Sequence, residues 1–246
     1  MSAVGIIPAR YRASRFPGKP LTQIAGRPML HYVIEGARRA KRLREVWVAT
    51  DDERIAEAAA ALGAPVAMTS PEHPTGTDRL AEVAQGLEAD IIVNVQGDLP
   101  FFPPAMVEDA VAILTRSPAA AMSTVKTPIH EAAEWHNPNV VKVVTDRDGY
   151  ALYFSRSPIP FYRDQGPGAG GQGEVFGYRH IGLYVYRRDF LLTFTRLPVT
   201  PLETAEKLEQ LRALEWGYKI TVSETERPTV EVDTPEDLRR AEEMMP

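Results

Sequence analysis

The sequence predicts an α/β fold in which a mostly parallel sheet, covered by helices on both faces, continues into an antiparallel extension. In the first half of the chain, short apolar runs alternate with segments of helical periodicity. These runs lack the polar alternation of half-exposed strands, which is typical of parallel strands buried on both faces. After about residue 120, hairpin and aromatic strand patterns replace this alternation, and they predict the antiparallel part.

The first half contains strand and helix patterns in strict alternation. The predicted strands are 3–9, 45–50, 64–69 and 90–95, and the predicted helices are 29–41, 51–63 and 76–87. The second helix is the clearest, because it has acidic residues in its first turn, alanines in its middle and Gly63 at its end. Sheets of this type bind ligands at the carboxyl ends of their strands.

The second half begins with a hairpin predicted at 140–156, around the turn "DRDG". An aromatic strand is predicted at 178–190, after a glycine-rich loop at 166–173. One long helix (202–217), two late strands (219–224 and 229–233) and a terminal helix (234–245) follow. The chain contains no segment with the composition of an interdomain linker. We therefore predict a single domain over residues 1–246, with an antiparallel region at roughly 120–190.

Composition excludes several classes of function. The 246 residues carry a net charge of -5, which argues against a general nucleic-acid binder. The chain has no cysteine, so thiolate metal sites and cysteine nucleophiles are excluded. Its apolar runs are too short to cross a membrane, and its N-terminus resembles a strand rather than a signal peptide. We expect a cytoplasmic protein.

A basic loop, "ARYRASRFPGKP", follows the first predicted strand and carries Arg10, Arg12, Arg15 and Lys19. A solvated surface loop is the alternative interpretation. Prolines restrict this backbone, however, and guanidinium groups suit phosphate oxygens. It is not a P-loop, because Ala13 replaces the first glycine and Pro20 replaces the hydroxyl residue. A G-x-G-x-x-G dinucleotide fingerprint is also absent from this turn.

Several segments together resemble the 3-deoxy-manno-octulosonate cytidylyltransferases, or CMP-Kdo synthetases. They are "IIPARYRASRFPGKPL", "VATDDERIAEAAAALG", "GTDRLAEV", "IIVNVQGDLP", "NPNVVKVVTDRDGYALYFSRSPIP", "RHIGLYVYRRDF", "PLETAEKLEQLRALEWGYKI" and "VDTPEDL". The resemblance implies a Rossmann-like nucleotide-diphospho-sugar transferase fold and a homodimer, with dimerisation and sugar binding in the antiparallel region at roughly 120–190. It also implies the Mg²⁺-dependent reaction of CTP with Kdo to give CMP-Kdo and pyrophosphate, for lipopolysaccharide synthesis.

The resemblance also assigns site residues. The catalytic set is Arg10, Arg15, Lys19, Asp98 and Asp233, of which Asp98 and Asp233 bind the metal. The CTP set is Pro8, Ala9, Arg10, Ala13, Ser14, Arg15, Lys19, Gly76, Thr77 and Arg79. The Kdo set is Gln96, Arg156, Arg163, His180, Tyr184, Glu209 and Gln210. Direct attack of the anomeric hydroxyl on the α-phosphate needs no covalent intermediate, and metal coordination would lower the pKa of that hydroxyl.

Several of these residues also have a plainer interpretation. Asp98 could be a turn aspartate, and Thr234 beside Asp233 fits a helix N-cap. Lys142 could serve the phosphates or point to water. Glu209 and Gln210 have the pattern of a solvated helix face.

Other interpretations concern the pocket and the function. Leu99 replaces the acidic residue that the family usually has after Asp98. Thr75 or Thr77 could simply cap the helix at 76–87. Arg156, at the end of an apolar strand face, predicts an anionic partner, either internal or from a ligand. A cytidylyltransferase for 8-amino Kdo or sialic acid, and a non-catalytic nucleotide-sensing module, remain the rival functions.

Overall fold

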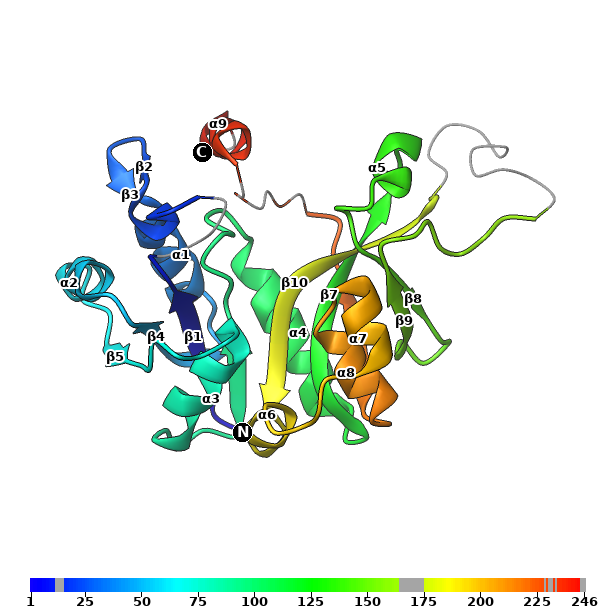
Figure 1. Cartoon of the computed structure of the whole chain (residues 1–246), viewed down its shortest axis with the longest axis horizontal. Helices are drawn as coiled ribbons and strands as arrows, with labels where there is room; N and C mark the ends of the chain where they lie inside the picture. The colour runs from blue at the N-terminus through cyan, green and yellow to red at the C-terminus, as the bar shows by residue number, and fades with distance from the viewer. Residues whose placement is uncertain (12–15, 164–174, 228, 230–231, 233, 244–246) are drawn as a thin grey trace. The chain divides into compact units, whose positions relative to one another are not determined.

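The computed structural model describes residues 1–11, 16–163, 175–227, 229, 232 and 234–243 (Figure 1). The chain forms two compact units. Unit 1 consists of Met1–Val111, Val185–Thr195 and Pro228–Pro246, and unit 2 consists of Ala112–Tyr184 and Arg196–Arg227. The prediction of a single domain stays a prediction. Among the described residues, no helix combines the length and apolar character needed to cross a membrane.

Unit 1 is built on a parallel sheet. Its strands are β1 (Ala3–Ala9), β4 (Leu43–Thr50), β5 (Val66–Met68) and β6 (Ile91–Asn94). The central strand β1 pairs with β4 on one side and β6 on the other, and β4 pairs with β5 (Figure 1). The connecting helices are α1 (Met29–Arg38), α2 (Glu53–Ala61) and α3 (Gly76–Gln85). Right-handed crossovers place α1 and α2 on one face and α3 on the other.

The remaining elements of unit 1 come from distant parts of the chain. They are the 3₁₀ turn η1 (Lys19–Leu21), the hairpin β2 (Gln23–Ile24) and β3 (Arg27–Pro28), α6 (Arg188–Phe194) and α9 (Pro235–Glu243). Helix α4 (Pro104–Arg116) begins here and ends in unit 2. Val232, from the C-terminal segment, is fully buried in one cluster with Ile24 and Met29. The C-terminal segment therefore belongs to the core of unit 1.

Unit 2 contains the antiparallel part. Its elements are β7 (Ala120–Ile129), α5 (Ala132–His136), β8 (Lys142–Thr145), β9 (Ala151–Ser155), most of β10 (Gly177–Arg187), α7 (Pro201–Glu206), α8 (Gln210–Glu215) and β11 (Lys219–Glu224). Strand β8 pairs antiparallel with β9 and β10, while β11 pairs in parallel with β7. The predicted turn closes the β8–β9 hairpin, with Gly149 at a φ of 80°. The predicted α/β class is thus confirmed.

One predicted helix is wrong. The segment 202–217 forms two helices, α7 and α8, because Lys207 adopts a left-handed conformation with a φ of 55°. Leu208 then turns inward and is 6% exposed. The predicted strand at 178–190 ends at Arg187, because helix α6 begins at Arg188. The elements without a sequence prediction are η1, β2, β3, α4, β7, α5 and α6. Of the predicted strand at 229–233, only Thr229 and Val232 lie within the described residues.

Candidate functional site

The carboxyl end of β1 is closely packed by two glycines from other elements. A Cβ atom at Gly97, which follows β6, would lie 3.1 Å from the carbonyl oxygen of Pro8. A Cβ atom at Gly76, at the start of α3, would lie 3.5 Å from the Pro8 ring. The sequence therefore allows β1, β6 and α3 to meet at this edge. This close packing brings the predicted CTP residues Pro8, Ala9 and Gly76 together at the carboxyl edge of the sheet.

An ion pair joins two of the predicted catalytic residues. The Nζ atom of Lys19, at the start of η1, lies 3.1 Å from Oδ2 of Asp98, after β6. The two side chains are 15% and 30% exposed, so the pair is reachable from solvent. Lys19, predicted to bind phosphate, and Asp98, predicted to bind metal, thus lie next to each other at the edge of the sheet.

The C-terminal segment also reaches Asp98. The backbone N–H of Val232 donates to the carbonyl oxygen of Asp98 at 2.8 Å. Asp233 lies outside the described residues, but its neighbour in the chain is therefore in direct contact with the other predicted metal ligand. Thr234 caps α9, since its hydroxyl accepts from the backbone N–H of Asp237 at 3.2 Å and its own N–H donates to the Asp237 carboxylate. The predicted capping box is confirmed.

Leu99 is 1% exposed and belongs to the core of unit 1. A carboxylate at this position would lose its hydration, which is costly without a partner. The leucine therefore fits its surroundings in this chain, and it leaves Asp98 as the exposed carboxylate of the segment "QGDLP".

Arg79 is fully buried in α3, with 0% exposure. One guanidinium nitrogen, Nη2, lies 3.3 Å from Oδ1 of Asp51, and Nη1 donates to the hydroxyl of Thr69. Burial lowers the pKa of Arg79, and the Asp51 charge opposes that shift. Within the described part of the chain, Nε and Nη2 make no hydrogen bond. Nη2 has the Asp51 carboxylate as its ion-pair partner, and neither nitrogen is exposed to solvent.

The sequence interpretation missed Asp51 and Thr69 as supports of Arg79. Both follow strand ends, β4 and β5 respectively, as Asp98 follows β6. Asp51 was assigned to a helix start, whereas the helix begins at Glu53 and is capped by Asp52. The strand-end position was the signal that could have identified both residues.

The other predicted CTP residues vary in their surroundings. Arg10 is exposed at the end of β1, whereas Thr77 is buried in the first turn of α3. Thr75 is the N-cap of α3 and forms a capping box with Asp78, so the helix-capping interpretation is confirmed for Thr75. The predicted CTP residues Ala13, Ser14 and Arg15 lie outside the described residues, as does Arg12 of the basic loop.

In unit 2, backbone carbonyls fix the guanidinium of Arg156. Its Nε donates to the carbonyl of Glu206 at 2.8 Å, and its Nη1 donates to the carbonyl of Pro138 at 3.0 Å. The Glu206 carboxylate instead accepts from the backbone N–H of Arg156 at 2.9 Å and from the hydroxyl of Ser155 at 2.6 Å. Backbone carbonyls therefore orient the guanidinium, and among the described residues no carboxylate forms an ion pair with it. Such a group keeps its attraction for an anion.

The apolar strand face predicted beside Arg156 is only half correct. Phe154 is fully buried, but Leu152 is 62% exposed.

Lys142 neither points to water nor is available to phosphates. It is 0% exposed, and its Nζ donates to the carbonyls of Asn137, Val140 and Arg156 at 2.9, 2.5 and 2.7 Å. Burial lowers the pKa of Lys142, while the charge of Glu206 raises it. Both earlier interpretations of Lys142 are therefore wrong. It supports the turn and the strand end that hold Arg156.

Strand β10 carries buried side chains on both of its faces. Ile181, Leu183 and Val185 are buried on one face. On the other face, His180 is 7% exposed and its Nε2 lies 2.9 Å from the hydroxyl of Thr124. The rings of His180 and Tyr184 are 5.4 Å apart. Burial lowers the pKa of His180 to about 3, so this imidazole is neutral at pH 7.

The start of α8 is not the solvated face that its pattern suggests. Gln210 is 3% exposed, and its side-chain nitrogen finds no hydrogen-bond partner in the described parts of the chain. Glu209 is half-buried, with Oε1 3.8 Å from Nη2 of Arg212. Arg163, the last described residue before the glycine-rich loop, is exposed. Gln96, also predicted to bind Kdo, belongs to unit 1 and is half-buried.

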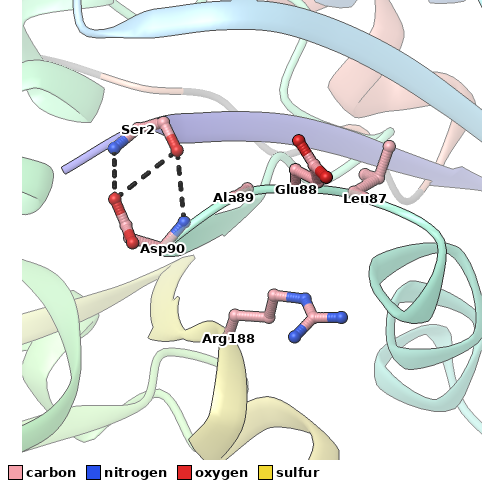
Figure 2. Close-up of a pocket in the computed structure, with 6 residues that line it drawn as sticks. All are labelled: Ser2, Leu87, Glu88, Ala89, Asp90 and Arg188. Atoms are coloured by element: carbon pink, nitrogen blue, oxygen red, sulfur yellow. Dashed lines mark hydrogen bonds between the residues drawn. The ribbon is translucent and has the colours of Figure 1, made fainter.

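A surface cavity of about 380 Å³ lies at the amino ends of β1 and β6 (Figure 2). Figure 2 shows Asp90 bonded to the backbone N–H and hydroxyl of Ser2. The guanidinium of Arg188 donates to the carbonyls of Ala84 and Gln85 at the end of α3. The cavity contains none of the predicted site residues, and it lies at the amino edge of the unit 1 sheet, opposite the carboxyl edge where Pro8 and Gly76 meet.

Comparison with known proteins gives a consistent result. A family model described as cytidylyltransferase matches residues 4–220. A Geobacter sulfurreducens protein named 3-deoxy-manno-octulosonate cytidylyltransferase is 54% identical over 249 residues, covering 100% of both chains. A Syntrophotalea carbinolica protein of the same name is 55% identical over 98% of both chains. A solved structure of CMP:2-keto-3-deoxy-manno-octonic acid synthetase complexed with CTP is similar with a TM-score of 0.91 at 43% identity, covering 99% of this chain and 98% of that one.

Proposed function

The chain belongs to the cytidylyltransferase family, and on this premise we propose that it transfers a cytidylyl group from CTP to Kdo. In this reaction, the anomeric oxygen of Kdo bonds to the α-phosphorus of CTP. The bond from that phosphorus to the oxygen bridging it to the β-phosphate breaks, so pyrophosphate leaves, and the hydroxyl proton is released. The products are CMP-Kdo and pyrophosphate, and CMP-Kdo is an activated sugar for lipopolysaccharide synthesis. Relatives more than 50% identical over the full chain carry this name.

Positive side chains provide the main chemical contribution. Arg10, Arg15 and Lys19 neutralise the triphosphate and the departing pyrophosphate, since phosphoryl-type transfer is catalysed mainly by positioning and electrostatics. Arg79 donates to the base from its buried position. Arg156, His180 and the other residues of the Kdo set bind the sugar acid, with the Arg156 guanidinium facing its carboxylate.

Asp98 and Asp233 hold the metal in this proposal. The donor set fits Mg²⁺, because carboxylate oxygens are the ligands that it prefers and the Asp98 side chain is partly exposed. When bound, Mg²⁺ supplies positive charge beside the phosphates and lowers the pKa of a coordinated hydroxyl. Lys19 contributes a charge of the same sign from the chain itself.

One observation carries the proposal: Lys19 contacts Asp98, and the residue before Asp233 contacts Asp98 as well. Asp98 thus contacts Lys19, which lies 79 positions before it in the sequence, and Val232, which lies 134 positions after it (232 − 98). These three residues meet at the carboxyl edge of the sheet formed by β1 and β6. A phosphate-binding lysine and a carboxylate metal site are expected to share such an edge.

Pyrophosphate release tests this proposal. We expect release only with CTP and Kdo together, and little with UTP. Asp98→Asn and Asp233→Asn should reduce kcat at least about 100-fold, as loss of a main electrostatic group does. Asp109→Asn, at an exposed position of α4, is the matched control and should behave as wild type. Turnover that survives both substitutions would overturn the metal assignment.

The same assay separates the rival functions. Faster release with an 8-amino Kdo or with sialic acid than with Kdo would change the substrate, and no release with any sugar acid would favour a nucleotide-sensing module. The homodimer, the role of the region at roughly 120–190 in dimerisation and sugar binding, and the cytoplasmic location stay predictions of the resemblance. Light scattering tests the first of these.

A further inference from the structure

Tyr11 and Gly18 meet at the base of the basic loop. The backbone N–H of Gly18 donates to the carbonyl of Tyr11 at 2.8 Å, and this bond joins the beginning and the end of the loop. Gly18 adopts a φ of +72°, and a Cβ atom there would lie 3.2 Å from Cε2 of the Tyr11 ring. The glycine backbone is therefore packed against the aromatic ring.

Arg54, from the first turn of α2, stacks on the same ring. Its guanidinium carbon lies 3.3 Å from the centre of the Tyr11 ring, which is the geometry of a cation–π contact. Its Nε and Nη2 donate to the two carboxylate oxygens of Asp52 at 2.9 and 2.6 Å. Asp52 is the N-cap of α2, so a capped helix end holds the guanidinium in place.

The charge of Arg54 is largely neutralised by Asp52. Hydrogen bonds from Arg54 lower the pKa of Asp52, which is therefore ionised at neutral pH. A phosphate ligand gains little from an arginine already paired in this bidentate way. The arrangement is suited to holding Tyr11 rather than to binding an anion.

We propose that Arg54 and Tyr11 are positioning residues for CTP: stacked together against Gly18, they fix both ends of the basic loop that presents Arg10 and Lys19. Arg10 immediately precedes Tyr11 and Lys19 immediately follows Gly18. This inference rests on the proposed function, in which Arg10 and Lys19 bind the triphosphate.

The proposal predicts a specific kinetic effect. Without the stack, the free protein samples loop conformations that do not bind CTP, and the apparent affinity falls in proportion to the competent fraction. Once CTP is bound, the same contacts are made, so kcat changes little. The Kdo set contains no residue of this loop, so we expect the KM for Kdo to stay unchanged.

Steady-state kinetics on the full chain test the proposal with Arg54→Ala and Tyr11→Ala. Arg54→Ala should raise the KM for CTP about two- to fivefold, the range of an exposed cation–π contact. Tyr11→Ala should raise it further, because it also removes the packing against Gly18. Both variants should keep kcat within about twofold. Tyr11→Phe retains the ring and should restore the wild-type KM.

Substitution of Gly26 serves as the control for backbone strain in a substitution of Gly18. Gly18→Ala and Gly26→Ala place an alanine at similar left-handed φ values, +72° and +78°. Only Gly18 has the tyrosine ring in contact, since a Cβ atom at Gly26 meets nothing within 4 Å. We expect the KM for CTP to rise in Gly18→Ala alone.

Lys19→Ala distinguishes failure of this inference from failure of the proposed function. If Lys19→Ala raises the KM for CTP while Arg54→Ala and Tyr11→Ala leave it at the wild-type value, the positioning role is overturned and the proposed function stands. An unchanged KM in all three variants would overturn the proposed function of the loop itself. A parallel rise in the KM for Kdo, with a lower melting temperature, would show a merely structural role and would also overturn the inference.

Discussion

His180 is a histidine that folding keeps uncharged. Its ring is buried between Thr124, Phe154 and Tyr184, and burial lowers its pKa from 6.5 to about 3. In the unfolded chain the ring takes up a proton near pH 6.5, whereas in the folded chain it does not. The unfolded state therefore binds more protons below pH 6.5, and folding becomes less favourable as the pH falls.

This difference predicts the pH dependence of stability. Between pH 6.5 and pH 5, the free energy of unfolding should fall by up to about 2 kcal/mol because of His180 alone. The measurement is urea denaturation at both pH values for wild type and His180→Gln. The wild type should lose more stability than the variant over this interval. Equal losses would show that His180 is not buried in its neutral form.

The sequence allowed some functional residues at strand ends to be predicted, but not the residues that hold the functional side chains in place. Asp98 could be found because it follows a buried strand and the carboxyl ends of parallel strands share one edge, whereas Gly76 came from the family resemblance. Asp51, which pairs with Arg79, and Glu206, which orients Arg156, make their contacts across sequence distances that periodicity does not encode. The assignments of Gln210 and Asp233 came only from family resemblance, since their local patterns indicate a surface helix and a helix cap.

At the scale of elements, Lys142 joins the end of β9 to the turn before β8. Its ammonium group donates to three backbone carbonyls, so replacing Lys142 by Met leaves buried acceptors without a donor. We expect a loss of about 2–3 kcal/mol in the free energy of unfolding, measured by urea denaturation. Lys41→Met, at an exposed position before β4, is the control and should stay within about 0.5 kcal/mol of wild type. A Lys142→Met protein as stable as this control would contradict the prediction.

Sequence periodicity predicted some secondary-structure elements well and others badly. The four parallel strands of unit 1 were predicted within a few residues, because buried parallel strands are continuous apolar runs, whereas the short hairpin of β2 and β3 was not predicted. The break between α7 and α8 has no glycine or proline to signal it. It forms because Leu208 is buried and Arg212 bonds back to Glu203 at 2.8 Å, so packing overrides helix propensity at Lys207.

At the scale of the whole molecule, the first compact unit is assembled from three separate stretches of chain. Val232 connects the last of them to Ile24 and Met29 in the core. Val232→Ala should therefore destabilise the protein by about 2 kcal/mol through the cavity it leaves. It should also raise the metal concentration needed for half-maximal activity, because Asp233 is the next residue.

Thermal denaturation and a metal titration of pyrophosphate release measure these two effects. Glu242→Ala, at an exposed position of the terminal helix α9, is a control that changes the same segment at a solvated side chain. It should leave the metal requirement unchanged. If Val232→Ala lowers the melting temperature but does not change the metal requirement, the packing role of Val232 stands and its link to the metal site does not.

The ion pair between Lys19 and Asp98 has a consequence for the order in which ligands bind. A cation arriving at Asp98 and a polyanion arriving at Lys19 must each separate these two side chains. The ligand that binds first bears the whole free-energy cost of separating the ion pair. The ligand that binds second then meets a side chain that is already separated from its ion-pair partner. The two ligands should consequently bind with positive, reciprocal cooperativity, each increasing the affinity for the other.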